Sequence, residues 1–208
     1  MQFLRRLLPI SRIGLILQAK SAAAKSMSTD LRAGSRLLTP AERQRIRIHR
    51  VTHMDNPFMA RAIQLSLDNV LSGQGGPFGA VIVKDGRILA EGVNRVTATH
   101  DPTAHAEVAA IRQACAKLGV FELKECELYT SCEPCPMCLG AIYWARLARV
   151  YYGNLAADAS QIGFDDSFIY REFAQSLSER KIPMVQLMRE QALAAFRAWR
   201  EKPDKIPY

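Results

Sequence analysis

Two short motifs in this sequence carry the side chains best suited to chemistry. They are His105-Ala106-Glu107 and Pro134-Cys135-Pro136-Met137-Cys138, and the second begins 27 residues after the glutamate. One imidazole and two thiolates can hold a zinc ion while leaving its fourth tetrahedral position open for water, as catalytic zinc sites do. Zinc lowers the pKa of a coordinated water from about 16 to roughly 7. Glu107 is then a candidate general base and acid that moves the water's proton.

The remaining cysteines allow other interpretations of the same residues. Cys132 extends the second motif into a run of three cysteines like part of a ferredoxin loop, but the next residues contain no fourth cysteine. A closed zinc site would need a further Cys or His pair, and the two cysteines left, Cys115 and Cys126, are eleven residues apart. We interpret these two as small buried side chains. A closed structural zinc site and a redox pair stay open as alternatives.

Length and composition indicate one globular domain with an appendage. The chain has 208 residues, of which 49% are hydrophobic and 23% charged, and this is ordinary for a globular protein. We expect no membrane span, because no apolar run approaches the roughly 20 residues that a spanning helix requires. An odd number of cysteines with three clustered favours a reducing compartment. The composition therefore predicts a cytoplasmic protein.

The net charge of +8 is concentrated at one end of the chain. Residues 1–53 contain 11 lysines and arginines against 2 acidic residues, whereas residues 54–208 contain 17 against 18. Proteins that bind a phosphate backbone generally present a basic face. The nearly neutral part carries both motifs, so we expect a small-molecule substrate rather than a nucleic acid.

Residues 1–53 form a basic leader with a composition of its own. They are rich in arginine, serine and alanine and contain no acid before Asp30, as organelle transit peptides do. A poorly ordered tail, or a start at Met27 or Met54, would explain the same composition. We therefore expect a poorly ordered leader over 1–53 and a single domain over 54–208. If the leader is a transit peptide, the location becomes mitochondrial.

Hydrophobic periodicity and turn signals predict alternating helices and strands after Asn56. On an ideal helix His105 and Glu107 point about 200° apart, so we expect the metal beyond the helix end. Both motifs lie at helix beginnings, where the partial positive charge favours a thiolate. The expected helices are 57–71, 101–118, 135–146, 166–173 and 190–201, and the expected strands or extended segments are 79–84, 87–93, 127–130, 149–152 and 184–187. This order predicts a three-layer α-β-α domain with a mixed five-stranded sheet.

With these residues in view, the sequence resembles the cytidine deaminase superfamily and, within it, bacterial-type guanine deaminases. The resemblance covers about 56–208. The residues that carry it are Gly76-Pro77-Phe78-Gly79-Ala80-Val81, Asp101 to Glu107, Tyr129 to Cys138, Gly163 to Tyr170 and the closing Tyr208. The middle two motifs are shared with cytosine, adenine and tRNA-adenosine deaminases. The segment from Phe164 to Tyr170 and the final tyrosine point to guanine.

The resemblance implies a role for each residue of the site. Zinc would be bound by His105, Cys135 and Cys138, and Glu107 would carry protons. Substrate contacts would come from Asn94, Asp166, Phe78 and Tyr208. The resemblance further implies a purine base as substrate, hydrolysis of guanine to xanthine and ammonia, and a homodimer that exchanges its C-terminal segments.

Plainer interpretations exist for several of these residues. Asn94 is a common turn former, Asp166 could cap the following helix, and a chain-terminal tyrosine is usually disordered. Core packing alone would explain the aromatic side chains Phe78 and Trp144, and for Trp144 we favour this interpretation. A tRNA-adenosine, nucleoside or cytosine deaminase and a non-catalytic structural zinc module are the alternative functions.

Overall fold

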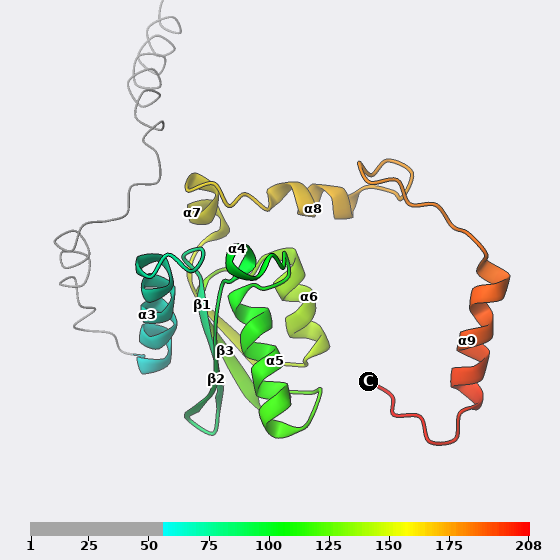
Figure 1. Cartoon of the computed structure of the whole chain (residues 1–208), viewed down its shortest axis with the longest axis horizontal. Helices are drawn as coiled ribbons and strands as arrows, with labels where there is room; N and C mark the ends of the chain where they lie inside the picture. Colours follow the sequence, from blue (N-terminus) through cyan, green and yellow to red (C-terminus); the bar gives the residue numbers. More distant parts are fainter. Residues whose placement is uncertain (1–55) are drawn as a thin grey trace, which may run out of the picture. The chain divides into compact units, whose positions relative to one another are not determined.

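The computed structural model describes residues 56–208, so the predicted leader over 1–53 lies outside the described residues. None of the helices in the described part is long and apolar enough to cross a membrane. In chain order the elements are α3 (Pro57–Leu71), β1 (Gly79–Lys84), β2 (Arg87–Val93), α4 (Val96–Thr99), α5 (Ala106–Leu118), β3 (Cys126–Cys132), α6 (Pro136–Trp144), β4 (Arg149–Asn154), α7 (Ala156–Gln161), α8 (Ser167–Ala174) and α9 (Arg189–Glu201) (Figure 1).

The sheet of the described residues is mixed, as predicted, but it has four strands rather than five. Its order is β2-β1-β3-β4, with β1 antiparallel to both neighbours and β3 parallel to β4. The expected fifth strand at 184–187 is wrong, because this segment pairs with no strand of the sheet. Met184, Val185 and Leu187 are all exposed. A short apolar run alone therefore did not distinguish a strand from an uncovered segment.

Helices cover both faces of the sheet and complete the predicted three-layer domain (Figure 1). Successive side chains of a strand point to opposite faces, and β3 separates the two cores in this way. Leu128 belongs to the core that also contains Ala110 and Ile142, from α5 and α6. Tyr129 belongs to the other core, with Ala62 of α3 and Val81 of β1. The helices α5 and α6, which carry the two motifs, thus share one face.

Several predicted helix bounds shift in the structure. The first motif was expected inside a helix starting near Asp101, but α5 begins at Ala106. Instead, His100 has a φ of 53° and Asp101 Oδ1 accepts hydrogen bonds from the backbone N–H and the hydroxyl of Thr103, at 2.8 and 2.7 Å. The hydrogen bond to the Asp101 side chain pairs the backbone N–H of Thr103 in a turn, so this N–H needs no helix partner. His105 therefore lies outside the helix, in extended backbone.

Gly92 of β2 allows the start of α5 to pack directly on the sheet. A Cβ at this position would lie 2.1 Å from the carbonyl oxygen of Ala106 and 2.6 Å from the nitrogen of Ala110. Both atoms belong to helix backbone, so neither can rotate away. Ala106 follows His105 directly, and Gly92 therefore sets the position of the first motif relative to the sheet.

We expect Gly92→Ala to lower the free energy of unfolding by roughly 3 kcal/mol, because overpacking against backbone forces α5 away from β2. The zinc content of the purified variant should fall as well. Thermal denaturation and metal analysis measure the two effects. The control is Gly140→Ala in α6, where an added Cβ meets no atom within 4 Å. It should keep its zinc and gain up to about 1 kcal/mol of helix propensity. A G92A variant as stable as the wild type would contradict this role.

Candidate metal centre

Two helix starts bring the three predicted ligands together. His105 is the N-cap residue of α5 and Cys135 is the N-cap residue of α6, and both have extended backbone. Neither uses its side chain to cap its own helix. Cys138 lies in the first turn of α6 and is fully buried. All three side chains are therefore free to face a common point.

The distances between these ligands fit a tetrahedral zinc ion. The sulfurs of Cys135 and Cys138 each lie 3.5 Å from Nδ1 of His105. All three ligand atoms lie within 4.8 Å of one another. Bonds of about 2.3 Å to sulfur and about 2.05 Å to nitrogen, at the tetrahedral angle, give a sulfur–nitrogen separation of roughly 3.6 Å. The described residues place no fourth His, Cys, Asp or Glu in this group.

The electrostatics prepare Cys135 to bind a metal as a thiolate, the form in which cysteine is a ligand. Its pKa is lowered to about 4, mainly by the hydrogen bond from Cys138 and further by His105. The hydrogen bond to Cys135 raises the pKa of His105 in turn. The hydrogen bond with Cys135 and burial raise the pKa of Cys138. The N-terminal ends of two helices add a partial positive charge here.

The other three cysteines serve different purposes. Cys126 is buried in the core beneath α5 and α6, Cys115 packs against it, and burial raises the pKa of both thiols. Cys126 is therefore a small buried side chain, as predicted, whereas Cys115 is only partly buried. Burial also raises the pKa of Cys132 to about 11, so this residue is a neutral thiol. All five cysteines are free, and the described residues form neither a closed zinc site nor a disulfide.

Glu107 lies beside the ligands without belonging to their group. It is only 6% exposed, and burial raises its pKa. Its Oε2 lies 3.4 Å from the sulfur of Cys138, and its Oε1 accepts a hydrogen bond from the hydroxyl of Thr130 at 3.3 Å. This position beside the ligand group suits a group that exchanges protons with a water.

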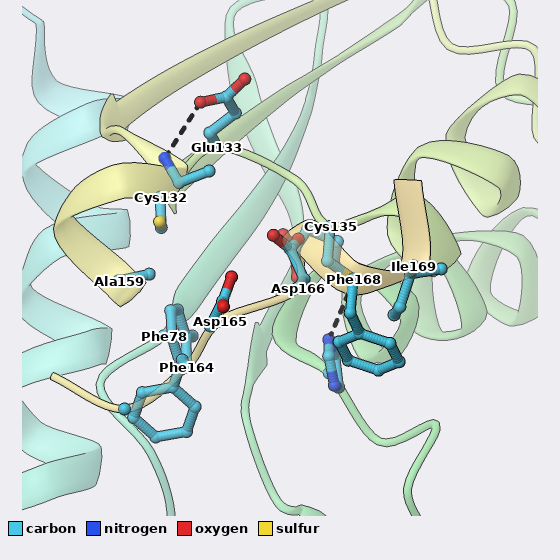
Figure 2. Close-up of a pocket in the computed structure, with 14 residues that line it drawn as sticks. Phe78, Cys132, Glu133, Cys135, Ala159, Phe164, Asp165, Asp166, Phe168 and Ile169 are labelled. Atoms are coloured by element: carbon cyan, nitrogen blue, oxygen red, sulfur yellow. Dashed lines mark hydrogen bonds between the residues drawn. The ribbon is translucent and has the colours of Figure 1, made fainter. Parts of the chain in front are cut away.

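A cavity of about 240 Å³ opens beside the metal ligands (Figure 2). Its walls combine aromatic and aliphatic side chains with four carboxylates, and no lysine or arginine lines it among the described residues. In the view of Figure 2, Phe78 and Phe164 lie on one side of the labelled carboxylates, and Phe168 and Ile169 on the other. The carboxylates come from Glu107, Glu133, Asp165 and Asp166. Such a cavity suits a flat, uncharged molecule with several N–H groups.

Two of the residues predicted to contact substrate line this cavity. Phe78 packs edge-to-face on Phe164, with ring centroids 5.0 Å apart. Asp166 is the N-cap residue of α8 but makes no capping hydrogen bond through its side chain. Asp165 accepts the backbone N–H of Ser167 instead, at 2.9 Å. The carboxylate of Asp166 thus remains free to face the cavity, where burial raises its pKa.

The other two predicted contact residues do not line the cavity in this chain. Asn94 is buried and its Oδ1 accepts the backbone N–H of Val96 at 3.3 Å, as a turn former does. Tyr208 is 73% exposed, and its ring lies 6.2 and 6.0 Å from those of Phe121 and Trp144. Contact of Asn94 and Tyr208 with substrate therefore stays a prediction. Trp144 was expected in the core, but it is 68% exposed, so that expectation is wrong.

Sequence reasoning missed Glu133 and Thr130. Glu133 directly precedes the second motif, lines the cavity and accepts a hydrogen bond from the backbone N–H of Ala156 at 3.0 Å. The two-residue period of β3 could have identified Thr130 as a residue that faces α5 and α6. Thr130 and Cys132 alternate with Tyr129 and Ser131, so they share the face of Leu128, on which α5 and α6 pack.

Comparisons with known proteins agree with this site. A family model described as the cytidine and deoxycytidylate deaminase zinc-binding region matches residues 52–154. Guanine deaminase from Bacillus subtilis is 57% identical over 151 residues, which cover 73% of this chain and 97% of that protein. The X-ray structure of guanine deaminase from Bacillus subtilis superposes with a TM-score of 0.72 at 55% identity, over 75% of this chain and 99% of that one.

More distant relatives share part of the chain. A tRNA-specific adenosine deaminase of Agrobacterium fabrum is 52% identical over 77 residues, which cover 37% of this chain and 51% of that protein. A variant protein solved in complex with 8-azaguanine is 37% identical with a TM-score of 0.50, over 52% of this chain and 63% of that one. The matched zinc-binding region includes His105, Cys135 and Cys138, which the structure brings together. By these matches and this geometry, the chain belongs to the cytidine and deoxycytidylate deaminase family of zinc-binding enzymes.

Proposed function

We propose that this chain hydrolyses guanine to xanthine and ammonia. The observation that carries the proposal is the match with the Bacillus subtilis guanine deaminase, which spans 97% of that enzyme at 57% identity. The cavity next to the metal ligands gives the proposal a physical basis, since its volume of about 240 Å³ suits a single purine base. The hydrolysis forms a bond from the water oxygen to the amine-bearing ring carbon and breaks the bond from that carbon to nitrogen.

In this proposal the metal ligands and Glu107 divide the work. His105, Cys135 and Cys138 hold zinc, which when bound makes a coordinated water more acidic. Glu107 takes the proton of the attacking water, since its Oε2 faces the ligand group and burial raises its pKa. It then delivers protons to the ring nitrogen and to the leaving amine. A buried carboxylate with a raised pKa suits both transfers.

The cavity walls supply recognition. Phe78 offers an apolar wall against the purine, and the Asp166 carboxylate accepts from its N–H groups. Four carboxylates without a lysine or arginine among the lining residues disfavour a phosphate-bearing substrate. The proposed substrate is therefore a free base rather than a nucleotide or a polynucleotide.

A substrate panel tests this function. Purified zinc-loaded protein is incubated with guanine, adenine, cytosine, their nucleosides and tRNA, and ammonia release is measured. We expect guanine to give the highest kcat/KM. Faster turnover of a tRNA or a nucleoside would overturn the assignment to guanine but leave deaminase chemistry in place. No ammonia from any substrate would favour the structural zinc module.

We also propose that the protein acts as a homodimer in which each C-terminal segment serves the partner's site. No side chain of α9 is fully buried in a single chain, and Phe196 is 75% exposed. Phe164 and Phe168, which line the cavity, are about half exposed. A tail from a second copy would cover both surfaces. Tyr208 would then reach the partner's cavity.

A complementation experiment tests the exchange. A chain ending at Lys205 lacks Tyr208 but keeps Glu107, and we expect it to lose at least tenfold in kcat/KM for guanine. A Glu107→Gln chain has the tail but not the proton carrier. Co-expression of the two should restore about a quarter of wild-type activity per site, because about half of randomly paired dimers are mixed and each has one complete site. Absence of recovery, or full activity of the shortened chain alone, would contradict the exchange.

A further inference from the structure

Each of the two carboxylate oxygens of Glu107 has a contact of its own, and only one of these contacts is with a metal ligand. Its Oε2 faces Cys138 at 3.4 Å, whereas its Oε1 accepts the hydroxyl of Thr130 at 3.3 Å. Thr130 lies in the middle of β3 and is 1% exposed. The hydroxyl therefore reaches the carboxylate on the oxygen that does not face the ligands.

The surroundings of Thr130 fix the direction of its hydroxyl. The residue pairs with Ala80 of β1 on one side and with Tyr152 of β4 on the other, so its backbone is held in the centre of the sheet. A β-branched side chain has few χ1 positions available to it. The hydroxyl is thus already in place before any substrate binds. Such preorganisation is what a precise proton transfer requires.

Metal binding makes the hydrogen bond from Thr130 to Glu107 more important for the position of the carboxylate. A zinc-bound cysteine is a thiolate and has no proton to donate, so the contact from Cys138 to Oε2 ceases to be a donated hydrogen bond. Among the described residues, Thr130 is then the one side chain that donates a hydrogen bond to the Glu107 carboxylate. Oε2 is then left without a side-chain donor among the described residues.

We propose that Thr130 is a positioning residue, whose hydroxyl anchors Oε1 of Glu107 and thereby aims Oε2 at the water and the purine. The proposal rests on the deaminase function proposed above. It assigns the effect to the hydroxyl group and not to the volume of the side chain. Valine has the shape of threonine without the hydroxyl, and serine has the hydroxyl without the methyl. The two substitutions therefore separate positioning from packing.

Kinetics on zinc-loaded protein give the first test. We expect Thr130→Val to lower kcat for guanine by roughly ten- to a hundredfold, as a small misplacement of a proton carrier does. The KM should stay within about twofold and the zinc content at one per chain. Thr130→Ser should recover at least a third of the wild-type kcat. A packing role predicts the reverse order, with T130V active and T130S impaired. If T130V does not fold, Thr130→Ala replaces it in the test, and we expect the same loss of kcat.

Crystal structures of the zinc-loaded variants give a second readout that does not depend on turnover. The Glu107 carboxylate should rotate away from its wild-type position in T130V, or in T130A where that variant replaces it, and keep the position in T130S. A carboxylate that stays in place without the hydroxyl overturns the proposal, as does a kcat within twofold of wild type. Equal losses in T130S and T130V also overturn it. If wild-type protein turns over no base, the proposed function fails, and the crystal structures still decide the role of Thr130.

Discussion

Glu107→Gln is expected to lower kcat for guanine by about 10³-fold or more, with zinc still bound at one ion per chain. Glutamine matches glutamate in shape but cannot take up a proton from water, and general acid–base catalysis typically contributes about 10²–10⁴-fold. Glu107 is buried, so no solvent base can easily replace it. Steady-state ammonia release and metal analysis on the same sample measure the two quantities together.

The control for this prediction is Glu127→Gln on β3. Glu127 is a carboxylate on the sheet, whereas Glu107 lies in α5. Glu127 accepts hydrogen bonds from Tyr129 and Tyr151 on the opposite face and does not line the cavity. We expect its kcat to stay within about twofold of wild type. A Glu107→Gln protein that kept more than a tenth of the activity would show that another group carries the proton. A variant that lost its zinc would show that Glu107 is a ligand.

Cys138→Ala is expected to remove both zinc and activity. The Cys138 sulfur is fully buried and lies 3.5 Å from Nδ1 of His105, and Cys135 is the only other cysteine that the described residues place in the ligand group. Two remaining ligands hold zinc far more weakly than three, so we expect less than about 0.1 zinc per chain after gel filtration. Addition of excess zinc should not restore turnover.

Cys132→Ala provides the matched control, because it removes a thiol three residues from Cys135 in the same motif. Cys132 does not belong to the group of ligand atoms, all within 4.8 Å of one another, that His105, Cys135 and Cys138 form. We therefore expect the Cys132 variant to keep one zinc per chain. Loss of zinc from this variant, or retention of zinc by Cys138→Ala, would show that the ligand set is different.

The sequence alone was sufficient for the ligands because local spacing determines them. Cys135 and Cys138 are fixed by the helix that Pro136 begins, and His105 by the start of α5. The hairpin of β1 and β2 was predicted to the residue, since Asp85 and Gly86 both take the positive φ that its turn requires. Features of this kind depend on a few neighbouring residues.

The features that the sequence did not reveal depend on distant parts of the chain. The segment 184–187 has the composition of a strand but finds no partner in the sheet. Thr130 meets Glu107 only because β3 and α5 pack together across 23 residues of sequence. Trp144 follows the apolar pattern of α6 yet lies on its exposed side. Packing partners decide such cases, and periodicity within one element cannot identify them.

The X-ray absorption spectrum of the zinc-loaded protein at the zinc edge tests the central claim most directly. That claim is a zinc ion with three protein ligands and one position left for water. The spectrum should show two sulfurs at about 2.3 Å and two nitrogen or oxygen atoms at about 2.0–2.1 Å, and it should be the same in Glu107→Gln. A third sulfur in the shell, or a light-atom shell that shrinks when Glu107 is replaced, would mean that a fourth side chain occupies the position and would contradict the account.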